Sequence, residues 1–440
     1  MLLKVLNGVR VRHCKGTARL APKRIPVPKR VYIPMAMHLG APAALTVKVG
    51  DTVKVGTLIG DGSVGLSSHV YSSVSGTVVK IDEIISIVGK HVPTVVIESD
   101  GEQSLDENIS PYEVNTKEEF LEVLRKSGIV GLGGAGFPTP VKLNVDSARV
   151  DTLIINGAEC EPYITSDTRT MLDNADDVAY GISLVQKFLE IDRVIIGIEK
   201  NKPECIRTMR NATKNMSGIS IKPLPSVYPQ GGEKVIVYHT TGRIIPQGKL
   251  PIDVGVIVLN CTTAATIAKF IRTGMPLVEK CVTVDGSAVK DPQNLIVPIG
   301  MPIGELIEHC GGFKEEPRKI LYGGPMMGIA LADPASPILK QTNAVIFMGE
   351  REATPPPVTP CIKCGACINA CPFSLDPVAI SKAYRANEPE MLEKLKVDIC
   401  MECGCCSYVC PAKRNIVQRN KMAKTMLREH QMKIKATGGK

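Results

Sequence analysis

The 440-residue sequence contains no tryptophan, and aromatic residues make up only 4% of it. It also lacks any run of about 18 consecutive apolar residues, which is the length that a membrane-spanning helix needs. The most apolar stretch, residues 254–271, is interrupted by Asn260, three threonines and Lys269. The first residues contain no apolar core of the kind found in signal peptides. We therefore expect a cytosolic protein, with any membrane contact peripheral.

The net charge of +9 is concentrated at one end of the chain. Between Lys413 and Lys440 there are nine basic residues and a single acid, Glu429, which gives this segment a net charge of +8. Such a segment is either a solvated helix or frayed end, or a contact with anionic lipid or an acidic partner. No recognition motif or aromatic platform accompanies the charge, so nucleic acid is not an expected partner.

Eight of the fifteen cysteines form two copies of the spacing C-x₂-C-x₂-C-x₃-C-P. In this run three cysteines hold one [4Fe–4S] cluster, and the fourth reaches the neighbouring cluster. Structural zinc does not require the fourth cysteine and the proline, and disulfides are disfavoured in the cytosol. The spacing therefore predicts a ferredoxin-like helical module with crossed ligation: one cluster on Cys361, Cys364, Cys367 and Cys410, and a second on Cys371, Cys400, Cys403 and Cys406.

A glycine-rich stretch at residues 130–143, VGLGGAGFPTPVKL, matches the G-x-G-x-x-G fingerprint of dinucleotide-binding folds. That fingerprint needs a strand before it and a helix that opens at its third glycine. Here residues 115–128 predict a capped helix upstream, and Pro138 and Pro140 remove N–H donors downstream. The match is therefore not a Rossmann fingerprint, although its glycines still let backbone N–H groups approach a phosphate.

Residues 150–275 alternate apolar strand-like runs with amphipathic helical runs. This alternation predicts an α/β domain whose site lies at the carboxyl edge of its sheet. Polar loops follow at residues 155–167, 228–234 and 259–265. Each of these loops alone is a turn that carries little functional information.

With these loops in this order, followed by the two cysteine motifs, the chain resembles the RnfC family of the Rnf (Rsx) electron transport complex. Its middle part is similar to the flavin- and NADH-binding subunit of respiratory complex I. The resemblance implies that the glycine loop cradles FMN and that NADH stacks on the flavin. It implies FMN-side positions for Gly131, Gly133, Gly134, Ala135, Lys142, Asn156, Glu159, Cys160, Gly232, Glu233, Asn260 and Thr263.

The resemblance also matches three residues to NADH-contacting positions: Phe137, Glu161 and Tyr228. Two departures from the complex I signature stand out. Leu132 replaces an arginine, which favours an RnfC-like chain, and Ala158 replaces an aspartate, which makes the expected flavin environment less acidic.

The implied organisation is a multidomain α/β plus β protein. No lysine occurs between Val55 and Val79, where a lipoyl-like domain would carry its modified lysine, so we expect an unmodified domain. The expected units are a lipoyl/biotinyl-like β-sandwich (1–110), an FMN/NADH-binding α/β domain (111–275), an SLBB β-grasp domain (276–350), the two-cluster module (351–412) and a basic C-terminal tail (413–440).

NADH gives up two electrons as a hydride, whereas iron–sulfur clusters accept single electrons, and a flavin connects the two. The resemblance implies a subunit of a ferredoxin:NAD⁺ oxidoreductase at the cytoplasmic face of the membrane. Its partners would be the membrane and iron–sulfur subunits of the Rnf complex, which couple the reaction to ion translocation, and indirectly ferredoxin. A microcompartment cobalamin reductase and a ferredoxin-like carrier or scaffold without nucleotide activity are the alternatives.

Overall fold

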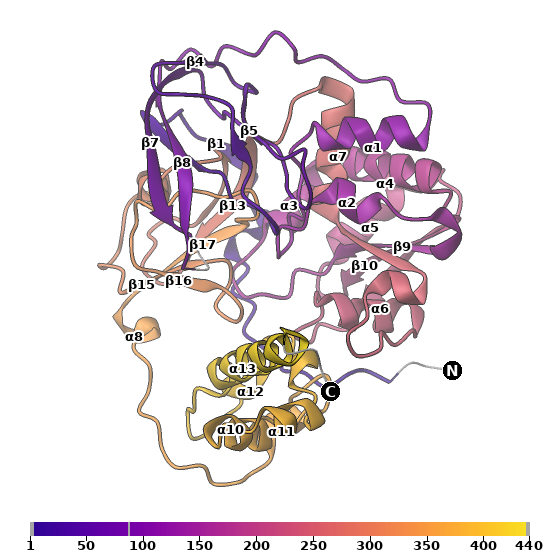
Figure 1. The fold of residues 1–440 in the computed structure, drawn as a ribbon, viewed down its shortest axis with the longest axis vertical. Coiled ribbons are helices and arrows are strands. Elements are labelled where there is room, and N and C mark those ends of the chain that lie inside the picture. Colours follow the sequence, from indigo (N-terminus) through magenta and orange to yellow (C-terminus); the bar gives the residue numbers. More distant parts are fainter. Residues whose placement is uncertain (1–3, 87–88, 437–440) are drawn as a thin grey trace.

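The structure is a computed structural model that describes residues 4–86 and 89–436. Figure 1 shows three sheet-containing parts packed together, and a smaller helical module that a long extended segment connects to them. Among the described residues, no helix combines the length and the apolar character that a bilayer crossing requires.

The first part contains two small antiparallel sheets, with strand orders β2-β8-β7-β4 and β3-β5-β6. Along the β7–β8 hairpin, Val78 and Ile97 are buried while their neighbours Thr77 and Glu98 are exposed. This alternation is the pattern of a sheet with one face on the core, and it fits the expected β-sandwich. The strands are β2 (Arg30–Pro34), β3 (Ala44–Leu45), β4 (Thr52–Val53), β5 (Leu58–Asp61), β6 (Val70–Tyr71), β7 (Gly76–Ile85) and β8 (His91–Ser99).

The second part is built on a parallel sheet of order β11-β10-β9-β12, with β9 (Thr152–Gly157), β10 (Arg193–Glu199), β11 (Ile219–Leu224) and β12 (Val256–Asn260). The chain leaves β9 toward β10 and β11 on one side and returns as β12 on the other. The carboxyl ends of β9 and β12 therefore flank a topological switch point, which is where open α/β sheets bind ligands.

Helices cover both faces of this sheet (Figure 1). Ile154 points to the face that Ile236 of α6 covers, whereas its neighbours Leu153 and Ile155 point to the opposite face, in the main core. A strand buried on both faces reads as a continuous apolar run, as β9 does. The helices are α1 (Lys117–Arg125), α2 (Thr139–Leu143), α3 (Ser166–Asp173), α4 (Ala175–Leu189), α5 (Pro203–Ala212), α6 (Glu233–Thr241) and α7 (Cys261–Thr273).

The third part is a six-stranded mixed sheet of order β1-β14-β13-β17-β15-β16. Its edge strand β1 comes from the N-terminal segment, so the first and third parts are interleaved. The strands are β1 (Lys23–Arg24), β13 (Glu279–Asp285), β14 (Gln293–Pro298), β15 (Lys319–Tyr322), β16 (Ile329–Leu331) and β17 (Ala344–Met348).

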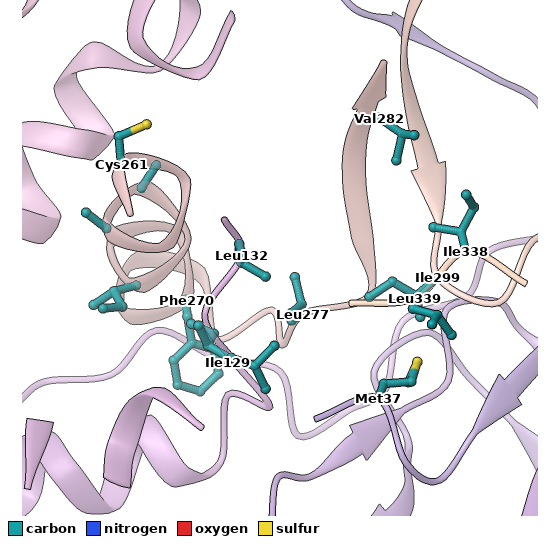
Figure 2. Packing of buried hydrophobic residues seen from close by; sticks show 14 of the residues in the cluster. Met37, Ile129, Leu132, Cys261, Phe270, Leu277, Val282, Ile299, Ile338 and Leu339 are labelled. Atoms are coloured by element: carbon teal, nitrogen blue, oxygen red, sulfur yellow. The ribbon is translucent and has the colours of Figure 1, made fainter. Parts of the chain in front are cut away.

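One apolar cluster runs through all three parts. Figure 2 shows a portion of it, with Leu132 of the glycine-rich stretch beside α7, and with Leu277 on the path toward Val282 of β13. Met37 of the first part belongs to the same cluster. Because this core is continuous, packing fixes how the three parts are placed relative to one another.

The helical module repeats itself at a spacing of 39 residues. Short helices α9 and α12 follow Gly365 and Gly404, which have φ values of +75° and +79°, and Lys363 and Glu402 share a positive φ at the matching position before them. Its helices are α9 (Ala366–Asn369), α10 (Pro377–Arg385), α11 (Pro389–Lys394), α12 (Cys405–Tyr408) and α13 (Ile416–Ala436), whereas α8 (Glu350–Ala353) packs on the third part before the extended segment. Each cysteine motif is thus a copy of one backbone design.

The basic segment expected as a C-terminal tail forms α13 over its described residues. Helix α13 begins 39 residues after α10 and is therefore the second copy of that helix. Ile416 and Val417 are buried beside cysteines of the motifs, and Ala423 and Leu427 pack with residues of α10 and α11. This helix belongs to the module, and Lys440 of the expected tail lies outside the described residues.

Candidate functional site

Two asparagines lie at the carboxyl edge of the switch point, Asn156 next to the end of β9 and Asn260 at the end of β12, and they are paired in register. The Asn260 carboxamide caps α7, accepting from Thr263 N at 3.2 Å, and its Nδ2 donates to Asp167 Oδ2 at 2.8 Å. The Asn156 Nδ2 donates to Gly231 O at 2.9 Å. Both predicted flavin-side asparagines thus tie the loops of this edge together.

The glycine loop (residues 131–136) lies against the first turn of α7. Leu132 N donates to Thr263 Oγ1 at 3.0 Å, which anchors the loop. A Cβ on Gly133 would lie 2.5 Å from Asn260 Nδ2, so a side chain there would disturb the α7 cap. A Cβ on Gly134 would meet no atom within 4 Å. The fold therefore requires glycine at 133 and leaves open space at 134, which suits a backbone cradle for a phosphate.

Most of the other residues predicted for this loop are exposed to solvent. Gly133, Gly134 and Ala135 are exposed, and Gly131 N closes the loop by donating to Phe137 O at 2.8 Å. The five-residue helix α2 follows, and Pro140 lies in its first turn, where a missing N–H is tolerated. The upstream helix and this short downstream helix agree with the prediction that the stretch is not a Rossmann fingerprint.

Lys142 of α2 already has protein partners. Its Nζ donates to Val258 O at 2.8 Å and pairs with Glu233 Oε1 at 3.0 Å. Glu233 is the first residue of α6, and Gly232 precedes it. A Cβ on Gly232 would lie 2.2 Å from Met401 Cε, so this predicted flavin-side glycine also allows close approach of the cluster module.

The loop after β9 carries a buried carboxylate. Glu159 Oε1 accepts from Asp167 N at 2.8 Å, and Oε2 accepts from Thr168 Oγ1 at 2.6 Å. Burial is the largest effect on this group, and it raises the pKa of Glu159 despite the nearby Lys15 ammonium. The adjacent Cys160 thiol is buried as well, which raises its pKa to about 12. These two predicted residues face inward and shape the loop.

Lys15, which no sequence pattern singles out, hydrogen-bonds to the backbone of this same loop after β9. Its Nζ donates to Glu159 O at 2.9 Å, to Glu161 O at 2.7 Å and also to Ile164 O. Lys202 Nζ adds a contact to Glu159 O at 3.1 Å. Burial lowers the pKa of Lys15. A cation from the N-terminal segment therefore fixes the backbone that carries Glu159 and Glu161.

Glu161 and Tyr228, the two predicted NADH-side residues that lie farthest from the glycine loop in sequence, meet at a junction. The Glu161 carboxylate accepts from Met326 N at 3.0 Å and Met327 N at 2.8 Å, in the loop between β15 and β16. Tyr228 Oη lies 3.4 Å from Glu161 Oε1 and donates to Cys403 O at 2.8 Å. Burial raises the pKa of Glu161. The two side chains connect the sheet edge to the third part and to the cluster module.

The four cysteines predicted for the second cluster line one pocket, although they come from both motifs: Cys371, Cys400, Cys403 and Cys406. Among the described residues, no three histidine, cysteine or acidic side chains converge on a single metal-ion position. Burial raises the pKa of Cys406 to about 12, so a cluster that binds thiolates would displace protons there. The pocket fits a cluster held by crossed ligation, and the ligation itself stays a prediction.

The set predicted for the first cluster is more open. Cys367 and Cys410, which come from different motifs, share a small buried group with Ile416 and Val417 of α13. Cys361 and Cys364 are exposed. The fifth cysteine of the second motif, Cys405, is buried and donates to Tyr228 O at 3.8 Å. Its role is thus a contact with the second part of the chain.

Four families match the chain in the expected order. The RnfC barrel sandwich hybrid domain matches residues 3–102, and the Nuo51 FMN-binding domain matches residues 124–269. The SLBB domain matches residues 281–330, and the 4Fe-4S dicluster domain matches residues 357–416. These matches confirm the fold class and the predicted cofactor set of FMN and two [4Fe–4S] clusters.

Three curated relatives, each the C subunit of its complex, are 40% identical to the chain. That of the proton-translocating ferredoxin:NAD(+) oxidoreductase complex of Clostridium ljungdahlii aligns over 74% of this chain and 72% of its own. The C subunit of the Na(+)-translocating ferredoxin:NAD(+) oxidoreductase complex of Acetobacterium woodii aligns over 83% of this chain and 84% of its own. The C subunit of the ion-translocating oxidoreductase complex of Rhodobacter capsulatus aligns over 83% of this chain and 72% of its own.

A solved NAD⁺-reducing [NiFe]-hydrogenase, in its H₂-reduced state, shares the fold with a TM-score of 0.52 at 16% identity. The similarity covers 73% of this chain and 67% of the hydrogenase chain. From the relatives, the four matching families and the arrangement of the site, the chain belongs to the RnfC family of ion-translocating ferredoxin:NAD⁺ oxidoreductase complexes.

Proposed function

We propose that this chain carries electrons between NAD(H) and two [4Fe–4S] clusters through FMN, as the RnfC subunit of a ferredoxin:NAD⁺ oxidoreductase complex. The relatives from such complexes and the FMN-binding and dicluster family matches support the proposal. The match of residues 3–102 to the RnfC N-terminal domain favours this function over a microcompartment cobalamin reductase.

The observation that carries the proposal is the direct contact between the sheet edge and the second cysteine motif. Tyr228 is only 2% exposed, and its hydroxyl donates to Cys403 O while its own carbonyl accepts from Cys405 Sγ. The buried residues Val9 and Cys160 belong to the same apolar cluster as these side chains. A carrier that merely shared a chain with a nucleotide domain would not need its cluster loop packed into that domain.

This contact supports one order for the electron path. The loop that carries Cys400 and Cys403 faces the second part of the chain, and Met401 lies against Gly232 at the start of α6. Cys361 and Cys364, in contrast, are exposed. We therefore assign the cluster of the second motif as the one that exchanges electrons with the flavin.

The residues of the chain have binding and orienting roles in this mechanism. Gly134 leaves the cradle open for a phosphate, and Thr263 anchors the loop that forms it. Lys15 holds the loop that carries Glu159 and Glu161, the acids expected beside the flavin and the nicotinamide. Bound FMN supplies the chemistry that accepts a hydride and passes electrons on singly. No side-chain acid or base has to move a proton.

The cellular setting follows from the family. Relatives are subunits of complexes that translocate protons or Na⁺, so the proposed partners are the membrane and iron–sulfur subunits of such a complex. We propose peripheral attachment to that complex on the cytoplasmic face of the membrane, where NAD(H) is available.

Anaerobic purification of the full chain tests the proposal. We expect about eight iron and eight sulfide per chain, as two [4Fe–4S] clusters contain, together with one FMN. The flavin should be reduced when NADH is added. Two clusters without any FMN, even after incubation with added FMN, would instead identify a ferredoxin-like scaffold.

A further inference from the structure

Two lysines of the third part are almost completely buried, and their surroundings differ. Lys340 is 0% exposed, and its Nζ donates to Ser68 Oγ at 3.3 Å, to Gly128 O at 2.8 Å and also to His69 O. Its three N–H donors therefore have three acceptors. Lys280 is 5% exposed, and its Nζ has one long contact, 3.5 Å to Leu132 O. Lys280 is thus a buried cation whose donors are mostly unused.

An unpaired ammonium in this position is costly. Burial lowers the pKa of Lys280 to about 8, and the negative charge of Asp167 offsets only part of that effect. No carboxylate of the described residues lies within ion-pair distance of its Nζ. Buried charges in native proteins are paired or hydrogen-bonded, so the position of Lys280 points to an anion that the polypeptide does not provide.

Lys280 reaches the glycine loop from a different sheet. It lies on β13, and its single acceptor is the carbonyl of Leu132, inside the loop whose amide is anchored on Thr263 of α7. Figure 2 shows Leu132 between α7 and the segment that leads into β13. The 13-residue helix α7 directs the positive end of its dipole toward this loop. Three positive features therefore converge there: the dipole, the exposed amides of the loop and the buried ammonium.

We propose that Lys280 is a binding residue for a phosphate monoester held by the glycine loop, and that this phosphate is that of FMN. The inference rests on the proposed function and adds a contact from the SLBB part of the chain. Lys142 is less suited to this role, because its ammonium already pairs with Glu233. Of the two lysines near the glycine loop, Lys280 is the one without an ion-pair partner among the described residues.

The test compares FMN with riboflavin, which lacks the phosphate. The full chain, with its clusters in place, is depleted of flavin, and the dissociation constants of both flavins are measured by fluorescence quenching for wild type, Lys280→Met, Lys280→Arg and Lys340→Met. One charge-assisted contact is worth roughly a ten- to hundredfold change in affinity. Lys280→Met should bind FMN roughly ten- to hundredfold more weakly than wild type and bind riboflavin with unchanged affinity. Lys280→Arg should recover part of the lost FMN affinity.

Lys340→Met is the matched control, because it removes an equally buried lysine whose Nζ has three hydrogen-bond acceptors. It should leave the ratio of the FMN and riboflavin constants unchanged, even if the protein is less stable. An unchanged ratio in Lys280→Met would overturn the inference and leave the proposed function intact. Wild-type chain that binds neither flavin would overturn both.

A second measurement covers the case in which Lys280→Met does not fold. A crystal structure of the wild-type chain with FMN should place a phosphate oxygen within about 3 Å of Lys280 Nζ, at hydrogen-bond distance. Competition of FMN binding by inorganic phosphate should also be measurable, because free phosphate offers the same chemistry. A phosphate found away from Lys280 in that structure would contradict the inference.

Discussion

Replacement of Gly134 by valine tests whether the glycine is needed for flavin binding rather than for folding. A Cβ at this position has no atom within 4 Å and the glycine does not have a left-handed φ, so the variant should fold. Loss of chain entropy in the unfolded state should even add about 0.4–1 kcal/mol of stability, as for other glycine substitutions without strain. In the holoprotein, however, the new side chain would occupy space at the cradle.

The expected result for Gly134→Val is therefore folded protein with both clusters and little FMN. Thermal melting checks the fold, iron and flavin analysis checks the cofactors, and dithionite should still reduce the clusters. Gly133→Ala is the contrasting variant: its Cβ would lie 2.5 Å from Asn260 Nδ2, so it should lower the melting temperature. Stoichiometric FMN in purified Gly134→Val would refute the assignment of the loop.

Three further variants test the cluster ligands, the junction at Tyr228 and the role of α13. Cys371→Ser should damage the cluster of the second motif and spare the first, because Cys371 lines the pocket of the second cluster; EPR signal loss confined to the first cluster would reverse the crossed assignment. Tyr228→Phe leaves Cys403 O without its buried donor, which should lower the free energy of unfolding by about 1–3 kcal/mol. We expect slower NADH-driven cluster reduction and faster proteolysis of the module. Wild-type behaviour in both assays would argue against the junction. Arg428→Glu combined with Lys435→Glu should leave membrane retention unchanged, since α13 is a structural helix of the module; release from membranes would favour a docking role.

The elements of the second part were predictable from the sequence because apolar periodicity marks them. The capping box of α1, with Thr116 and Glu119, forms as expected, and the strand–helix alternation yields the parallel sheet. The polar loops after β9 and β12 could be placed together because parallel strands present their carboxyl ends at one edge, whereas Asn156 and Asn260 came from the family resemblance and their contact with the flavin stays a prediction. The domain boundaries drawn from the sequence stay predictions.

Other features depend on distant contacts that a single sequence does not reveal. Lys15 and Lys280 come from other parts of the chain, and no local pattern marks a lysine that folding will bury. The placement of α13 could have been anticipated, because the 39-residue spacing of the cysteine motifs extends to α10 and α13. The prediction of a basic tail at residues 413–440 rested on charge alone.

In the proposed mechanism, electrons pass between NADH and the clusters only through the flavin. The most direct measurement adds NADH anaerobically to wild-type and Gly134→Val chains and follows flavin absorption by stopped flow and cluster reduction by rapid-freeze EPR. We expect flavin bleaching to precede the cluster signal in wild type, and no cluster signal to develop in the flavin-free variant. Cluster reduction by NADH at the wild-type rate without flavin would contradict this mechanism.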